Sequence, residues 1–278
     1  MKAMQIRPPA VSGLFYPADP TLLSLTIDRL LEEQAPPTVA GHPLAIVSPH
    51  AGIAYSGPTA AAAYALLRRR MFRTAVIVSP SHREYFNGIS VYDGDAYRTP
   101  LGLINVDVEL RDQLLAHKGV IMSSPLGHRD EHAIEVQLPF LQRINPDAKV
   151  LPIVMGDQRS EYCLILAQAL ADILTSDHIL IASSDLSHFH DQEHALPRDR
   201  VIAESITAFK PMRLLEDLSS HRGEACGGGP IATVMSAAQA MGADAGTILH
   251  QCTSGDVTGD MQRVVGYLSA AFTISRMP

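Results

Sequence analysis

Short apolar segments alternate with longer amphipathic segments along the chain. Four short segments rich in Ile and Val lack the polar alternation of a half-exposed strand, which is typical of strands covered on both faces: 44–48, 74–79, 150–155 and 178–183. Helical spacing of apolar residues predicts six helices between and after them: 21–34, 59–70, 131–144, 162–174, 198–209 and 231–241. Two more strands are predicted at 246–250 and 264–272. This alternation predicts an α/β/α sandwich with a largely parallel mixed sheet.

Composition narrows the class of protein. The 278 residues contain no repeat or long linker, so we expect one domain over 1–278. A net charge of −7 argues against a general nucleic-acid binder. The absence of a long apolar run argues against a membrane span or a signal peptide. Three widely spaced cysteines form no disulfide framework, and we therefore expect a cytoplasmic protein.

Histidine is common in this chain, with 12 residues, and its distribution is informative. Three predicted strands each end in Ser followed within five residues by His: His50, His82 and His188, the last preceded by Asp185. The carboxyl ends of parallel strands line one crevice, so these side chains should converge. Imidazoles with a carboxylate suit zinc, iron, copper or nickel. The alternative is that each histidine only caps a strand end.

A second cluster, DEHAIE at 130–135, places His132 and Glu135 three residues apart. On a helix these two would share a face, and they could supply a general acid or base or support a metal ligand. The alternative is a helix start, with Asp130 as its cap and acidic residues in the first turn.

A third feature is the segment EACGGGP at 224–230, which precedes a predicted helix. Cys226 would lie just before the helix N-terminus, where the helix dipole lowers a thiol pKa and favours the thiolate. Consecutive glycines also permit close approach of a ligand to the backbone. The alternative is a flexible turn with an inert cysteine.

The chain resembles the Memo family, also called AmmeMemoRadiSam system protein B, over essentially its whole length. The resemblance rests on eight motifs in order: RPPAVSGLFYP, SPHAGIAYSG, SPSH, YRTPLG, DEHAIEVQLPFL, SSDLSH, ACGGGPI and SGDVTGD. It implies a fold similar to that of LigB-type class III extradiol dioxygenases, which use non-haem Fe(II).

The resemblance also implies a metal site of His50, His82 and Cys226, holding iron (Fe2+) first and copper second. Asp185, His188 and His132 would lie beside it as catalytic residues. Five further residues are expected to line the pocket: Tyr55, Ser81, Glu135, Gly227 and Gly228. The family name implies an AMMECR-type protein and a radical SAM protein as partners, besides an unknown small molecule or peptide.

Several functions stay open from the sequence. The first is a metal-dependent oxidoreductase of the Memo type, and the second is an active extradiol-type dioxygenase. The cysteine weighs against the second, since the facial triad of oxygenases uses a carboxylate as its third ligand. The third is a non-enzymatic peptide- or partner-binding module with a vestigial metal site. A cysteine hydrolase is less favoured, because no orienting Asn or Asp stands at a recognisable spacing.

Overall fold

The computed structural model of the chain describes residues 3–34, 39–117 and 119–275, and the other positions of the expected domain lie outside the described residues. The described strands are numbered in chain order: β1 (Ile6–Arg7), β2 (His42–Ser48), β3 (Thr74–Pro80), β4 (Ile89–Val91), β5 (Ala96–Thr99), β6 (Gly102–Asn105), β7 (Ile121–Ser123), β8 (Lys149–Met155), β9 (His178–Ser183), β10 (His188–His190), β11 (Ala245–Thr253) and β12 (Val264–Ile274).

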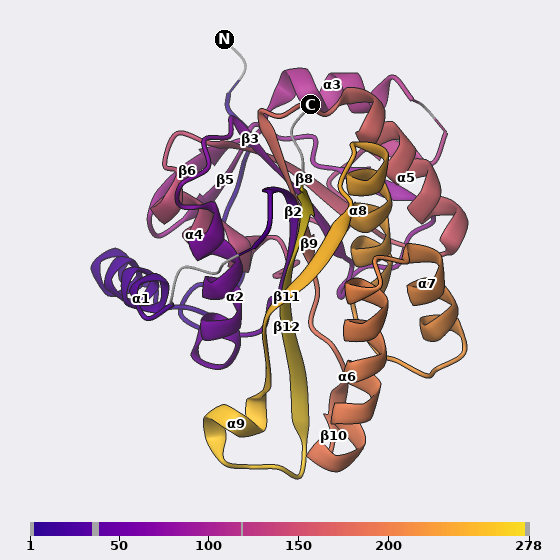
Figure 1. The fold of residues 1–278 in the computed structure, drawn as a ribbon. Helices are drawn as coiled ribbons and strands as arrows, with labels where there is room; N and C mark the ends of the chain where they lie inside the picture. The colour runs from indigo at the N-terminus through magenta and orange to yellow at the C-terminus, as the bar shows by residue number, and fades with distance from the viewer. Residues whose placement is uncertain (1–2, 35–38, 118, 276–278) are drawn as a thin grey trace.

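The helices lie mostly between the strands (Figure 1). They are α1 (Pro20–Glu32), α2 (Ile53–Leu67), α3 (Val108–Leu115), the 3-10 turn η1 (Glu135–Gln137), α4 (Leu138–Ile144), α5 (Ser160–Ile173), α6 (Gln192–Thr207), α7 (Pro211–Ser219), α8 (Gly228–Ala240) and α9 (Ser254–Thr258). Within the described ranges, every helix is too short or too polar to cross a lipid bilayer.

The described strands form a nine-stranded sheet and a small sheet of β1, β5 and β6. Four parallel neighbours, in the order β2, β9, β3 and β8, make the centre of the large sheet. Antiparallel pairs extend the centre on both sides, with β12 against β2 and β4 against β8. The predicted α/β class with a mixed sheet is therefore confirmed. The parallel centre brings the carboxyl ends of β2, β9 and β3 to one edge.

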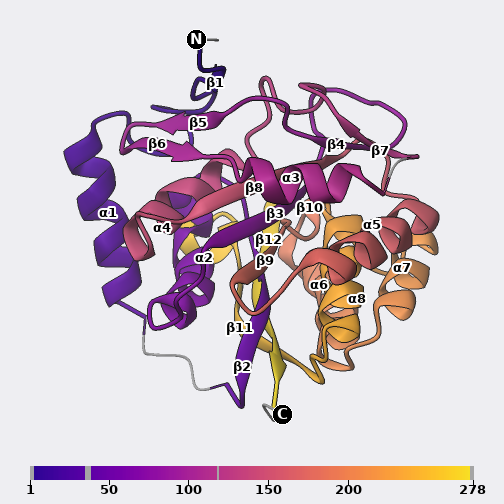
Figure 2. The ribbon, with the colours of Figure 1, turned by 90° about the horizontal axis from the view of Figure 1, so that it is seen from above.

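Helices cover both faces of this sheet (Figure 2). Helices α1, α2 and α4 lie on one side, and α5, α6, α7 and α8 lie on the other. Strand β2 shows why the central segments are apolar throughout: Ala45 and Val47 pack in one core, whereas Ile46 packs in the other. Burying one such aliphatic side chain stabilises the fold by about 1.5–3 kcal/mol, so both faces need apolar residues.

Two predicted helices start earlier than expected. The helix predicted at 59–70 begins at Ile53 and ends at Leu67, so the arginines that follow lie beyond its last turn. The helix predicted at 198–209 begins at Gln192, where the Asp191 carboxylate accepts the His194 backbone N–H at 2.9 Å. This cap satisfies an N–H that has no partner within the helix, and it fixes the earlier start.

The single helix predicted at 131–144 is wrong. Residues 131–134 are irregular, and η1 and the short α4 follow. The Glu131 carboxylate, not that of Asp130, accepts the backbone N–H groups of His132 and Ala133, at 2.9 and 3.0 Å. The Glu131 carbonyl accepts a hydrogen bond from Arg7 instead of one from the next helical turn. Contacts with distant segments thus override the local helical pattern.

Candidate metal centre

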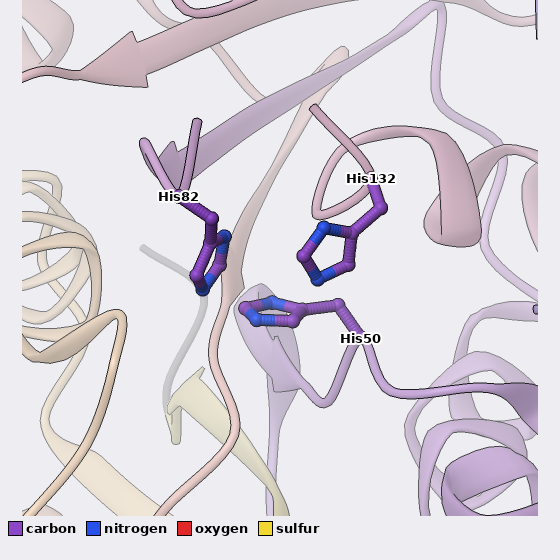
Figure 3. Close-up of side chains that lie close together, drawn as sticks. All are labelled: His50, His82 and His132. Atoms are coloured by element: carbon purple, nitrogen blue, oxygen red, sulfur yellow. The ribbon is translucent and has the colours of Figure 1, made fainter. Parts of the chain in front are cut away.

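Three imidazoles meet at the carboxyl edge of the parallel strands (Figure 3). His50 follows β2, His82 follows β3, and His132 comes from the irregular segment before η1. Their ring centroids lie 5.0 Å apart for His50 and His82, 5.3 Å for His50 and His132, and 4.6 Å for His82 and His132. One nitrogen from each ring lies within 4.8 Å of the other two, so the cluster could hold a metal ion.

His50 is almost fully buried, with 1% of its surface exposed. Its Nδ1 lies 2.9 Å from Oγ of Ser183, whose own hydroxyl donates to the Ala133 carbonyl at 2.7 Å. A hydroxyl has one hydrogen, so Nδ1 of His50 must be the donor in this contact. Burial, with His82 nearby, lowers the pKa of His50 well below its usual value. The ring is therefore neutral, and Nε2 carries no proton.

His82 is held by a carboxylate. Its Nδ1 lies 2.9 Å from Oε1 of Glu131, and its backbone N–H donates to Oε2 of Glu131 at 2.6 Å. Burial opposes ionisation of Glu131, but the hydrogen bonds and charge of His82 outweigh it and lower the pKa of Glu131 to about 2. An ionised carboxylate only accepts hydrogen bonds, so His82 donates from Nδ1 and turns Nε2 to the cluster.

His132 packs between the cluster and the N-terminal segment. Its ring centroid lies 4.8 Å from that of Phe15. Nδ1 lies 3.2 Å from Oε1 of Glu131 but makes no hydrogen bond to any described residue. Burial and the neighbouring His50 lower the pKa of His132 to about 4. A neutral imidazole in this position can bind a metal or accept a proton.

Cys226 completes the near surroundings of His50, with Sγ 3.2 Å from Nε2 of His50. The sulfur also accepts the Asp185 backbone N–H at 3.3 Å. It lies two residues before α8, as predicted, but the expected lowering of its pKa is wrong. Burial and the Asp185 carboxylate raise the pKa of Cys226 well above its usual value. Desolvation outweighs the helix dipole here, and the free thiol keeps its proton.

Asp185 and His188 lie beside the cluster on the segment after β9. Oδ1 of Asp185 accepts the backbone N–H groups of His50 and Ala51, at 2.8 and 3.3 Å, and thereby joins the ends of β2 and β9. His188 begins β10, opposite Val265 of β12, and lines a cavity together with Cys226. Their catalytic roles stay predictions.

Glu135 lies apart from the three imidazoles, and the helical face that it was expected to share with His132 does not exist. Its carboxylate pairs with Arg7 and accepts the Tyr16 hydroxyl. It also accepts the backbone N–H groups of Ala10 and Val11, at 2.7 and 3.0 Å. Glu135 therefore anchors the N-terminal segment through buried contacts.

Comparison with known proteins places this chain in a family. The family model described as "Memo-like protein" matches residues 7–271. The chain belongs to the Memo family. A MEMO1 family protein of Methanosarcina acetivorans is 39% identical, covering 95% of this chain and 98% of the relative. A MEMO1 family protein of Methanobrevibacter smithii is 37% identical, covering 96% and 99%.

A solved structure has a similar fold. The crystal structure of an uncharacterized protein from Escherichia coli K12 aligns with a TM-score of 0.52 and 14% sequence identity. The alignment covers 83% of this chain and 100% of the Escherichia coli chain. At this identity the likeness concerns the fold alone.

The other four residues that were expected to line the pocket of this Memo chain lie in surroundings that differ from one another. Tyr55 is 45% exposed on α2, and the Ser81 hydroxyl donates to the Glu84 carbonyl. A Cβ on Gly227 would lie 2.3 Å from the Ser183 carbonyl, so only glycine fits beside β9. Gly228 lines the cavity that Cys226 also lines.

Sequence patterns do not identify Glu131 and Ser183 as partners of the imidazoles in this Memo chain. Glu131 was interpreted only as an acidic residue favouring a helix start, although its position beside His132 was a usable signal. Ser183 was noted only as the last residue of a strand. Their hydrogen bonds to His82 and His50 span 49 and 133 residues along the chain. Such pairs depend on how the chain packs in three dimensions, and local sequence patterns do not show this.

Proposed function

We propose that the protein binds a redox-active metal ion, iron first and copper second, through His50, His82 and Cys226. The observation that carries this proposal is the pair of outer hydrogen bonds: Nδ1 of His50 donates to Ser183 and Nδ1 of His82 donates to Glu131. Both rings then keep Nε2 available to a metal ion. Ligand histidines in metalloproteins usually donate their other N–H in this way.

The donor chemistry fits such an ion. Two imidazoles and a thiolate suit iron or copper, and coordination removes the thiol proton that burial otherwise retains. A metal held here would supply reversible one-electron transfer. All three residues lie within the region that the family model matches.

The surroundings favour a small organic molecule as the substrate. A cavity of about 510 Å³ adjoins Cys226 and His188. Leu186, Leu215 and Leu218 contribute apolar surface, whereas Glu224 and Arg159 contribute charge. We therefore propose an oxidoreductase role.

An extradiol dioxygenase is the alternative enzyme. Its third ligand would be a carboxylate, but the two carboxylates beside the imidazoles already accept hydrogen bonds, Glu131 from His82 and Asp185 from His50. This arrangement favours the cysteine. Oxygen uptake by the Fe(II)-loaded protein with a panel of catechols tests the alternative, and uptake with ring cleavage would establish it over the first proposal.

Metal content after anaerobic reconstitution with Fe(II) tests the ligand set. We expect about one iron per chain in the wild type, a large loss in His50→Ala and Cys226→Ser, and no loss in Cys252→Ser, the matched control. Full iron in Cys226→Ser together with loss in His132→Ala would replace the thiol by the third imidazole. Wild-type protein without bound iron or copper would overturn the proposal.

A further inference from the structure

Glu131 is a buried carboxylate that lies outside the proposed ligand set. Its side chain is 1% exposed. Oε1 accepts hydrogen bonds from Nδ1 of His82 and from the backbone N–H groups of His132 and Ala133, at 2.9, 2.9 and 3.0 Å. Oε2 accepts the His82 backbone N–H at 2.6 Å. Four donors from two segments thus converge on one carboxylate.

The backbone of Glu131 is held as firmly as its side chain. Arg7 donates to the Glu131 carbonyl, and its Nε donates to the His128 carbonyl at 2.9 Å. Arg7 is itself buried and paired with Glu135. Neither end of Glu131 can move without breaking several buried hydrogen bonds and leaving buried polar groups unsatisfied.

The contact with His82 has a chemical consequence as well as a geometric one. A carboxylate that accepts Nδ1–H fixes the tautomer and the plane of the ring, and it makes Nε2 a stronger donor to a metal. His50 receives a weaker version of this effect, because its acceptor is the neutral Ser183 hydroxyl. The two imidazoles are therefore unequal, and Glu131 is the cause.

We propose that Glu131 is the positioning residue of the metal centre: it orients His82 and His132 toward His50 and strengthens metal binding by His82. This inference rests on the proposed function, since it requires that the cluster binds a metal.

The chain supplies a matched control four residues away. Glu135 is also a buried carboxylate that accepts two backbone N–H groups, but its charged partner is Arg7 and it contacts no imidazole. Replacing either carboxylate by Gln removes one buried charge at nearly constant volume. Only the Glu131 change replaces the charged acceptor of His82 by a neutral one.

Cobalt(II) is a suitable probe, because it binds N/S sites and its visible absorption reports ligand geometry and donor strength. We would titrate wild type, Glu131→Gln, Glu131→Asp and Glu135→Gln anaerobically with Co(II) alone. We expect Glu131→Gln to bind about 10–100-fold more weakly, with a shifted visible band. Glu131→Asp should recover part of the affinity and the wild-type band position.

Glu135→Gln should keep the wild-type affinity and spectrum while losing stability, which separates positioning from general support of the fold. Wild-type affinity and spectrum in Glu131→Gln would overturn the inference while leaving the metal centre intact. Wild type that takes up no Co(II) would instead overturn the proposed function. If Glu131→Gln does not fold, Glu131→Asp decides, and full wild-type affinity for Co(II) in that variant would overturn the positioning role.

Discussion

Two histidines of the cluster form the same kind of hydrogen bond through Nδ1, but to different acceptors. Each donates Nδ1–H to the protein, His50 to a serine hydroxyl and His82 to a carboxylate. A third, His132, lacks such a hydrogen bond to any described residue. Because outer hydrogen bonds fix the orientation of a ring, His50 and His82 are the preorganised pair of the cluster.

His128, a buried histidine outside the cluster, should make the free energy of unfolding depend on pH in acid. His128 contacts the Tyr97 hydroxyl through Nδ1 at 2.7 Å, and burial lowers its pKa to about 3. In the unfolded chain this imidazole takes up a proton below about pH 6.5. The unfolded state therefore binds more protons between these values, so acidification lowers the free energy of unfolding.

We expect His128→Gln to reduce this dependence. Urea denaturation of metal-free protein between pH 6 and pH 4 should show a slope shallower than that of the wild type by about 1.4 kcal/mol per pH unit. The His42→Gln variant, changed at an exposed position, should keep the wild-type slope. Parallel curves for wild type and His128→Gln would contradict the assignment.

At the scale of elements, the N-terminal segment depends on a turn far along the chain. β1 pairs with only β5, over two residues. The segment that follows it is anchored by Glu135 at the start of η1, through the N–H groups of Ala10 and Val11. Phe15 of this segment packs on His132.

We expect Arg7→Met to destabilise the protein by about 3–5 kcal/mol, because it leaves the buried Glu135 carboxylate without its cation. The double variant with Arg7→Met and Glu135→Gln should lose less stability than the sum of the losses in the two single variants. The reason is that the double variant has no unpaired buried charge. Urea unfolding of the four members of the cycle measures this coupling. Additive free energies would contradict a coupled pair.

Sequence patterns predict some helices and strands of this protein well and others poorly. β9 has the predicted bounds, and β2 and β3 differ from them by at most two residues, because strands buried on both faces are apolar at every position. The helix predicted at 131–144 is wrong because the Glu131 carbonyl and carboxylate take partners from Arg7 and His82. Apolar spacing carries no information about such partners.

At the scale of the whole molecule, the cluster joins segments that are separate in the chain. A metal ion bound by His50 and His82 would cross-link the ends of β2 and β3, which lie on either side of β9. A ligand that binds only the folded state raises its stability by mass action. Metal binding should therefore be visible in global unfolding.

We expect Fe(II), added anaerobically at 100 times its dissociation constant, to raise the free energy of unfolding by about 2.7 kcal/mol. A chelator should reverse the gain, and His50→Ala should show none. His42→Ala, in which an exposed histidine is removed, should respond like the wild type. A gain of equal size in His50→Ala would mean that the stabilising metal binds elsewhere.

The sequence by itself determined the central strands and the histidines that follow them. Strands covered on both faces are apolar at every position, and this is a local pattern that also shows which residues follow the carboxyl end of each strand. From these alone, His50 and His82 were expected at one edge, where the structure has them. Only the tertiary structure decided the partners: Glu131 for His82, Ser183 for His50, and Arg7 for Glu135. Buried polar groups must be satisfied by whatever packing brings near them, and packing joins residues that no local pattern connects.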